Sequence, residues 1–159
     1  MGEVVLEARG LTKAYGAGAA RVEALRGVDL QVRAGEFVAV LGPSGSGKST
    51  LLNMLGLMDR PTGGEVLVAG KPAAGMSEDG RAGLRNRHVG FVFQFDALMP
   101  EFTVLENVLM PGRIAAAGGA PMDGVEARAR ELLGVLGVEG LAERFPPELS
   151  GITDLKERL

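Results

Sequence analysis

The chain of 159 residues contains no cysteine, which excludes disulfide bonds, thiolate metal sites and cysteine nucleophiles. The redox compartment stays open, although a reducing cytosol is compatible with this absence. No apolar run approaches the roughly 20 residues of a membrane-spanning helix. The first residues lack the basic segment and apolar stretch of a signal peptide, and Leu6 does not fit the myristoylation pattern. We therefore expect a protein that is neither exported nor acylated and that reaches a membrane only through a partner.

The chain also lacks a strong charge of either sign. Lys and Arg number 17 and Asp and Glu 20, so the net charge is −3. A chain with this net charge has no overall positive electrostatic potential that would attract a polyanion, so nucleic acid is not an expected partner. Hydrophobic residues make up 46% of the sequence and charged residues 23%, which is enough apolar material for a folded chain of about one domain.

Two kinds of β-strand pattern are present in the first hundred residues. Residues 37–41, 66–68 and 89–93 are short apolar runs without alternation, a pattern typical of strands buried on both faces. They predict a covered, largely parallel sheet. Residues 4–7 and 24–32 alternate between apolar and polar residues, which favours an antiparallel edge or a small β subdomain.

Helical patterns become frequent toward the C-terminus. Residues 48–58 predict one helix, and Ser77 is a suitable cap for a second, short helix that ends near Arg87. Thr103 and Glu106 have capping-box spacing, and residues 125–136 follow the helical period. The order predicts an α/β core followed by a helical lobe from about residue 103.

The most informative segment is a glycine-rich loop between a predicted strand and a predicted helix. It satisfies the pattern G-x-x-x-x-G-K-[ST] with Gly42, Pro43, Ser44, Gly45, Ser46, Gly47, Lys48, Ser49 and Thr50. Glycines let successive N–H groups point inward, and the helix N-terminus adds partial positive charge, so the loop suits phosphate oxygens. Lys48 can reach the β and γ phosphates, Ser49 can bind Mg²⁺, and Thr50 can add a phosphate contact. The alternatives are a chance match and a relict loop that no longer binds.

These residues, with four further segments, resemble the ATP-binding subunits of ABC transporters, in particular the lipoprotein-releasing and macrolide-exporting type. The segments are residues 11–16, residues 24–36, residues 89–94 and residues 148–151. The resemblance covers the chain through Gly151. It implies an incomplete α/β fold with a P-loop NTPase-type core, an N-terminal antiparallel β subdomain and a C-terminal helical lobe. We expect the β subdomain and core in 1–94, the helical lobe in 95–151 and a divergent tail in 152–159.

The resemblance also implies roles for single residues. Tyr15 corresponds to the aromatic residue that stacks on adenine, with a packed surface tyrosine as the alternative. Gln94 corresponds to the Q-loop glutamine, whose amide oxygen approaches Mg²⁺ or the attacking water. Ser150 and Gly151 correspond to the signature motif that meets the γ-phosphate of the opposite subunit, although Ile152 stands where the family has glycine. Residues 95–106 would contact the membrane subunits, or else form ordinary core.

Several parts of the family pattern have no counterpart in this sequence. No apolar strand ends in an Asp-Glu pair, so the Walker B aspartate and the catalytic glutamate are absent. The only histidine, His88, precedes the Q-loop strand and is interpreted as a surface or structural residue rather than the switch histidine. We expect a truncated or frame-shifted subunit with an open sheet edge and an uncovered apolar face.

The resemblance implies the ATP-binding subunit of a membrane exporter, with ATP and Mg²⁺ as ligands. Its partners would be membrane-spanning transporter subunits and a second ATP-binding subunit in a head-to-tail dimer. It would be cytoplasmic, on the inner face of the membrane. We predict weak Mg-ATP binding and negligible hydrolysis by this chain alone.

Two other functions stay open: a non-catalytic interaction module or decoy that binds ABC subunits, and a different P-loop enzyme such as a small kinase. The arginines Arg81, Arg85 and Arg87 are interpreted as a solvated face of a helix, with binding of phosphate or acidic lipid as the alternative.

Overall fold

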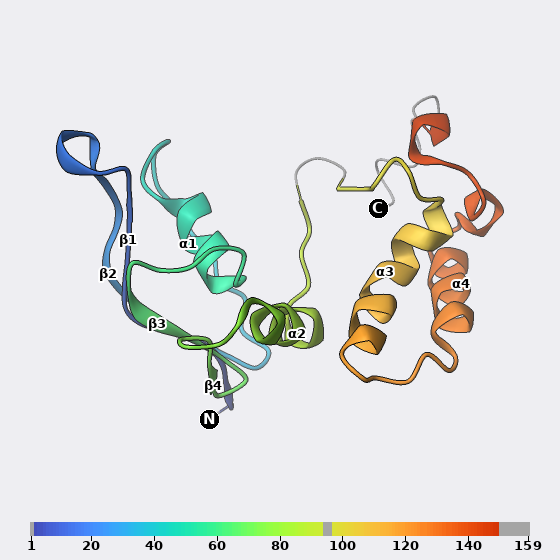
Figure 1. Ribbon diagram of the computed structural model, residues 1–159, viewed down its shortest axis with the longest axis horizontal. Coiled ribbons are helices and arrows are strands. Elements are labelled where there is room, and N and C mark those ends of the chain that lie inside the picture. Colours follow the sequence, from blue (N-terminus) through green and yellow to red (C-terminus); the bar gives the residue numbers. More distant parts are fainter. Residues whose placement is uncertain (1, 94–96, 150–159) are drawn as a thin grey trace. The chain divides into compact units, whose positions relative to one another are not determined.

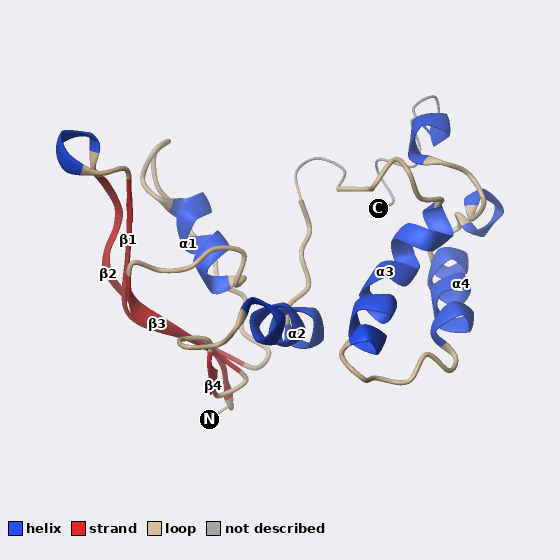
Figure 2. Ribbon diagram, viewed as in Figure 1, coloured by secondary structure: helices blue, strands red, loops and turns tan. Residues whose placement is uncertain are grey.

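A computed structural model describes residues 2–93 and 97–149 of the chain. These residues form two compact units, divided between Phe91 and Val92, and each unit is built around its own hydrophobic core. Figure 1 labels the helices and strands of both units, and Figure 2 distinguishes them by type.

The first unit contains one antiparallel sheet in the order β2-β1-β3-β4. The strands are β1 (Val4–Tyr15), β2 (Val22–Arg33), β3 (Gly63–Val68) and β4 (Lys71–Pro72). The alternating segments 4–7 and 24–32 therefore lie in β1 and β2, as predicted, but both strands are longer than the patterns indicated. A 3₁₀ turn, Gly18–Ala20, joins them.

The core of this unit lies between the sheet and two helices. Helix α1 (Lys48–Leu55) contacts β1 and β2, as Figure 1 shows, and helix α2 (Glu78–His88) contributes Leu84. Leu11 and Met54 have no exposed surface. The sheet buries one face in this way, as expected of an antiparallel sheet.

The prediction of a largely parallel sheet was wrong for the described residues. Residues 37–41 and 89–93 have no strand pairing there, and residues 66–68 belong to β3, which pairs with β1 in the antiparallel sense. An apolar run forms a strand only when a neighbouring strand takes up its backbone hydrogen bonds. Apolar side chains of these two unpaired runs are exposed: Phe37 is 95%, Leu41 89% and Val92 95% exposed.

Helix boundaries in this unit follow local signals. α1 ends at Leu55, three residues earlier than predicted, because Gly56 caps it and Leu57 adopts a left-handed backbone with φ 58°. α2 begins as expected, since the Ser77 hydroxyl accepts a hydrogen bond from the Gly80 N–H. His88 is the exposed last residue of α2, in agreement with its interpretation as a surface residue.

The second unit is helical. Its main elements are α3 (Val104–Ala117) and α4 (Val125–Val135), followed by 3₁₀ turns at Glu139–Leu141 and Pro146–Leu149. The predicted capping box is complete: Thr103 accepts from the Glu106 N–H, and Glu106 accepts from the Thr103 N–H. Val104 and Leu105 are buried in this core with Leu133. These two residues of segment 95–106 are therefore core residues.

Candidate nucleotide-binding site

The glycine-rich loop lies exposed immediately before α1. Gly42, Gly45 and Gly47 have φ angles of 155°, 78° and 87°, all in the region that L side chains avoid. At Gly47 space is also restricted, because a Cβ there would lie 2.5 Å from the Ala24 carbonyl oxygen of β2. Backbone conformation thus favours glycine at each of the three positions, and close packing also favours it at Gly47.

The N-terminus of α1 is open. Gly47 is the N-cap residue and supplies no side-chain hydrogen bond to the first turn. The first N–H groups of a helix have no partner within the helix, and they carry the positive end of its dipole. Ser44, Ser49 and Gly45 are exposed beside this turn, whereas Thr50 is half-buried. The arrangement suits a phosphate group.

Lys48 is held in place by the loop itself. Its ammonium donates to the carbonyl oxygens of Gly42 and Pro43 at 2.8 and 2.7 Å and lies 3.5 Å from the Ser46 hydroxyl. The positive charge is therefore held over the loop by neutral acceptors. Phosphate oxygens are stronger acceptors for an ammonium than carbonyls are, so a triphosphate can replace them.

Tyr15 lies at the end of β1 and is 44% exposed. Its strand pairs with β2 through Lys13 opposite Leu25 and Tyr15 opposite Val22. Gly47 packs on Ala24 of that same stretch of β2. The aromatic residue and the loop predicted to share a nucleotide therefore lie at the same end of one hairpin.

The first turn of α1 also offers an oxygen ligand for Mg²⁺. Within 2–93 and 97–149, the structure has no group of three His, Cys, Asp or Glu side chains that could hold a metal ion. The exposed hydroxyl of Ser49 is a hard oxygen donor in the first turn of α1. Mg²⁺ commonly takes one or two protein oxygens and completes its shell with water and phosphate oxygens, and Ser49 fits that role.

Three residues predicted at the site cannot be compared with the structure. Gln94, Ser150 and Gly151 lie outside the described residues. Their roles stay predictions.

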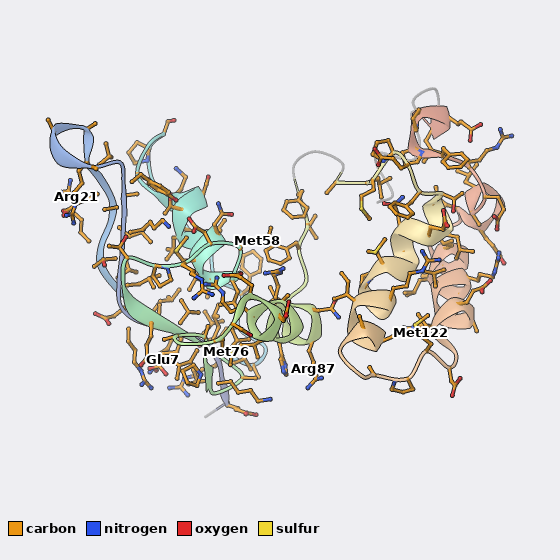
Figure 3. All side chains as sticks on the ribbon, viewed as in Figure 1. Glu7, Arg21, Met58, Met76, Arg87 and Met122 are labelled. Atoms are coloured by element: carbon orange, nitrogen blue, oxygen red, sulfur yellow. The ribbon has the colours of Figure 1, made fainter. Side chains whose placement is uncertain are left out.

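The arginine cluster on α2 was misinterpreted from the sequence. Arg81 is only 3% exposed, and its guanidinium donates to the carbonyl oxygens of Leu57 and Asp59. Arg85 donates to the same Leu57 carbonyl at 3.0 Å. Only Arg87 matches a solvated face, and Figure 3 shows its side chain projecting from α2. The arginines face inward because the left-handed turn after α1 leaves carbonyl groups that need donors.

Sequence reasoning also missed Asp59. Its carboxylate lies 2.7 Å from the Lys13 ammonium and accepts a hydrogen bond from the Arg60 N–H. The hydrogen bond from Lys13 holds the pKa of Asp59 below its usual value, although partial burial opposes the shift. No spacing rule joins residues 13 and 59, so the sequence contained no direct signal for this pair.

Comparison with known proteins agrees with the site. The sequence profile of the ABC transporter family matches residues 25–152, which is most of the chain. The chain belongs to the ABC transporter family. This assignment confirms the resemblance found in the sequence and its P-loop NTPase-type α/β fold class.

The relatives include lipoprotein-releasing system ATP-binding proteins LolD. The protein from Chromohalobacter salexigens is 50% identical over 149 residues, which cover 94% of this chain and 62% of the relative. The protein from Anaeromyxobacter dehalogenans is 51% identical over 146 residues, covering 92% of this chain and 60% of the relative. The chain thus spans about three fifths of the length of the relatives it matches.

Solved structures show the same similarity. A dimeric post-hydrolysis state of the ATP-binding cassette MJ0796, bound to ADP and Pi, aligns with a TM-score of 0.81 and 37% identity. The alignment covers 96% of this chain and 66% of that chain. A second dimeric structure of the same bacterial ABC transporter cassette aligns with a TM-score of 0.80. Among the described residues, no helix is long and apolar enough to cross a membrane.

Proposed function

We propose that this chain is an ATP-binding subunit of an ABC-type exporter that binds Mg-ATP through its glycine-rich loop. The observation that carries the proposal is the loop itself, in which three glycines with positive φ precede an uncapped helix N-terminus beside Lys48. The similarity to lipoprotein-releasing ATP-binding proteins supports the export role.

In the proposed complex, the N–H groups of the loop and the first turn of α1 bind the phosphates. Lys48 exchanges its carbonyl acceptors for β- and γ-phosphate oxygens. Bound Mg²⁺ would neutralise phosphate charge, and Ser49, together with Gln94, would hold it. Tyr15 would stack on the base, and Thr50 would add a phosphate contact.

Hydrolysis by this chain alone is proposed to be negligible. No apolar strand pattern in the sequence ends in an Asp-Glu pair that could hold the metal and orient the water, and phosphoryl transfer depends on those positioned groups. Ser150 and Gly151 would act on the nucleotide of a second ATP-binding subunit. Membrane-spanning partner subunits would hold the complex at the cytoplasmic face of the membrane.

A second function is favoured by exposed apolar residues in the first unit and at the start of the second unit. Phe37, Leu41 and Val92 are each 89% or more exposed, and apolar surface of this kind commonly marks a contact with another protein. We infer that a non-catalytic interaction module is the leading alternative. It predicts co-purification with ABC membrane subunits that survives loss of nucleotide binding.

Calorimetric titration of the monodisperse chain with Mg-ATP tests the first proposal. Binding should be lost in Lys48→Ala and retained in Lys71→Ala, whose lysine lies in β4, while Ser49→Ala should remove the dependence on Mg²⁺. No binding by folded wild-type protein would overturn the proposal. Robust ATP turnover that disappears in Lys48→Ala would overturn the claim of negligible hydrolysis.

A further inference from the structure

The Lys13 side chain is the starting point, because it is held next to Tyr15 from several directions. Its ammonium lies 5.0 Å from the centre of the Tyr15 ring, which is within the range of a cation–π interaction. The same ammonium donates to the Arg60 carbonyl at 2.7 Å and pairs with Asp59 at 2.7 Å. Although lysine is usually among the most exposed residues, the Lys13 side chain is only 12% exposed.

The turn that supplies these acceptors is itself fixed. The Thr62 N–H donates to the Thr12 carbonyl at 2.9 Å, and the Thr62 hydroxyl accepts from the Ala14 N–H at 3.0 Å. Buried Arg81 donates to the Asp59 carbonyl at 2.6 Å. The backbone on both sides of the Asp59 carboxylate is therefore tied to β1 or to α2.

The Asp59 carboxylate is ionised near neutral pH. Lys13 lowers its pKa most, the Arg60 N–H lowers it as well, and a hydrogen bond with Tyr15 adds a smaller effect in the same direction. Lys13, Asp59 and Tyr15 thus form one connected group, which we term the Tyr15 clamp.

The clamp lies at the same end of the β1–β2 hairpin as the glycine-rich loop. Lys13 pairs with Leu25 across the hairpin, and Gly47 packs against the carbonyl of the adjacent Ala24. One face of the Tyr15 ring is occupied by the ammonium, whereas 44% of the residue remains exposed. A ring held in this way needs less ordering when a flat ligand stacks on it.

We propose that Lys13, held by Asp59 and the Arg60 carbonyl, is a positioning residue that fixes the Tyr15 ring for stacking against a purine base. This inference rests on the proposed function, because it concerns the base of the same nucleotide. The clamp acts on the base and not on the phosphates. Loss of the clamp should therefore weaken the binding of ATP and leave unchanged the binding of a ligand that carries phosphates alone.

The composition of the chain supplies a direct readout. Tyr15 is the only tyrosine and there is no tryptophan, so tyrosine fluorescence reports on this ring alone. Mg-ATP and Mg-bound inorganic triphosphate are titrated against wild type, Lys13→Met and Asp59→Asn. Lys13→Arg keeps the cation. Glu65→Gln is the matched control, since Glu65 of β3 pairs at 3.4 Å with Arg9, which lies on β1 as Lys13 does.

Lys13→Met and Asp59→Asn should each weaken Mg-ATP binding about threefold, the size of a weak cation–π contact. Their affinity for inorganic triphosphate should be unchanged, and Mg-ATP should change the Tyr15 emission less than in wild type. Lys13→Arg and Glu65→Gln should match wild type. Circular dichroism of each variant checks folding.

An equal loss of affinity for both ligands would overturn the positioning role, and so would unchanged affinity for both. Wild-type protein that binds triphosphate as well as it binds Mg-ATP, with no change in Tyr15 emission, would also overturn it while leaving the phosphate loop intact. Wild-type protein that binds neither ligand would overturn the proposed function itself.

Discussion

Helices α1 and α3 lie in different units and begin in opposite ways. α3 begins with a capping box in which Thr103 and Glu106 satisfy each other's backbone N–H groups. α1 begins at Gly47, which has no side chain to act as a cap, and its C-terminal turn is held by Arg81 and Arg85 from α2. A helix that stabilises its own start is a structural element, whereas one that leaves its start open can bind an anion there.

The largest expected effect concerns the C-terminal end of α1. Arg81→Met should lower the free energy of unfolding of the first unit by about 3 kcal/mol, because the part-buried Asp59 carbonyl loses this donor and the buried Leu57 carbonyl keeps only Arg85. Urea unfolding followed by Tyr15 fluorescence measures it. Arg87→Met, on the exposed side of α2, should change it by less than about 0.5 kcal/mol. Equal effects would show that Arg81 does not hold the turn.

A smaller effect is expected at the open start of α1. Gly47→Ala should cost about 2 kcal/mol, since alanine is strained at φ 87° and its Cβ would meet the Ala24 carbonyl. It should also abolish Mg-ATP binding. Gly45→Ala has a similar φ of 78° but open space around it, and should cost about 1 kcal/mol. Calorimetry measures Mg-ATP binding, and urea unfolding measures the stability of each variant. The difference in stability between the two variants gives the cost of the close contact at Gly47 apart from backbone strain.

At the closed start of α3, Thr103→Ala should destabilise the second unit by about 1 kcal/mol, which is typical of a lost N-cap. Thr103→Ser keeps the hydroxyl and should restore most of the stability. Amide hydrogen exchange resolves the effect to the first turn of α3. Faster exchange in α1 as well would contradict the independence of the two helix starts.

The smallest effect concerns pH. The pKa of Asp59 lies below its usual value of 3.8 because Lys13 donates to it. Because the folded pKa is lower than the unfolded one, the pair stabilises the fold above about pH 4, and this stabilisation is lost as the pH falls through the folded pKa. The carboxylate is partly exposed, so Asp59→Asn should cost less than about 1 kcal/mol near pH 7.

The same measurement at lower pH gives the sign of the effect. The difference in unfolding free energy between wild type and Asp59→Asn should shrink as the carboxylate of the wild-type protein becomes protonated. A difference that grows on acidification would contradict the assigned pKa direction.

Local signals were enough for much of this fold. The caps at Ser77 and Thr103, the helix after the glycine-rich loop and the alternating strands of β1 and β2 were all found at or near their predicted positions. For the caps and the helix, neighbours within a few residues determine the conformation, whereas β1 and β2 are consecutive strands that take up each other's backbone hydrogen bonds. The glycine-rich loop belongs to this group as well.

What the sequence could not indicate depends on contacts between distant residues. The apolar runs 37–41 and 89–93 matched a strand pattern, but strand formation also requires a partner strand, and the described residues provide none beside them. Arg81 and Arg87 belong to the same short helix and to the same residue type, yet one is buried and the other exposed. The difference arises from the left-handed turn at Leu57.

The sequence by itself therefore determined the glycine-rich loop, the family and the helix caps, because glycine conformation and local hydrogen bonds act over a few residues. Only the tertiary structure decided that Asp59 holds Lys13 beside Tyr15, that Arg81 supports the end of α1 and that residues 37–41 and 89–93 do not pair as strands within the described part of the chain. These features depend on long-range contacts, whose free energy is set by burial and by the geometry of groups far apart in the chain.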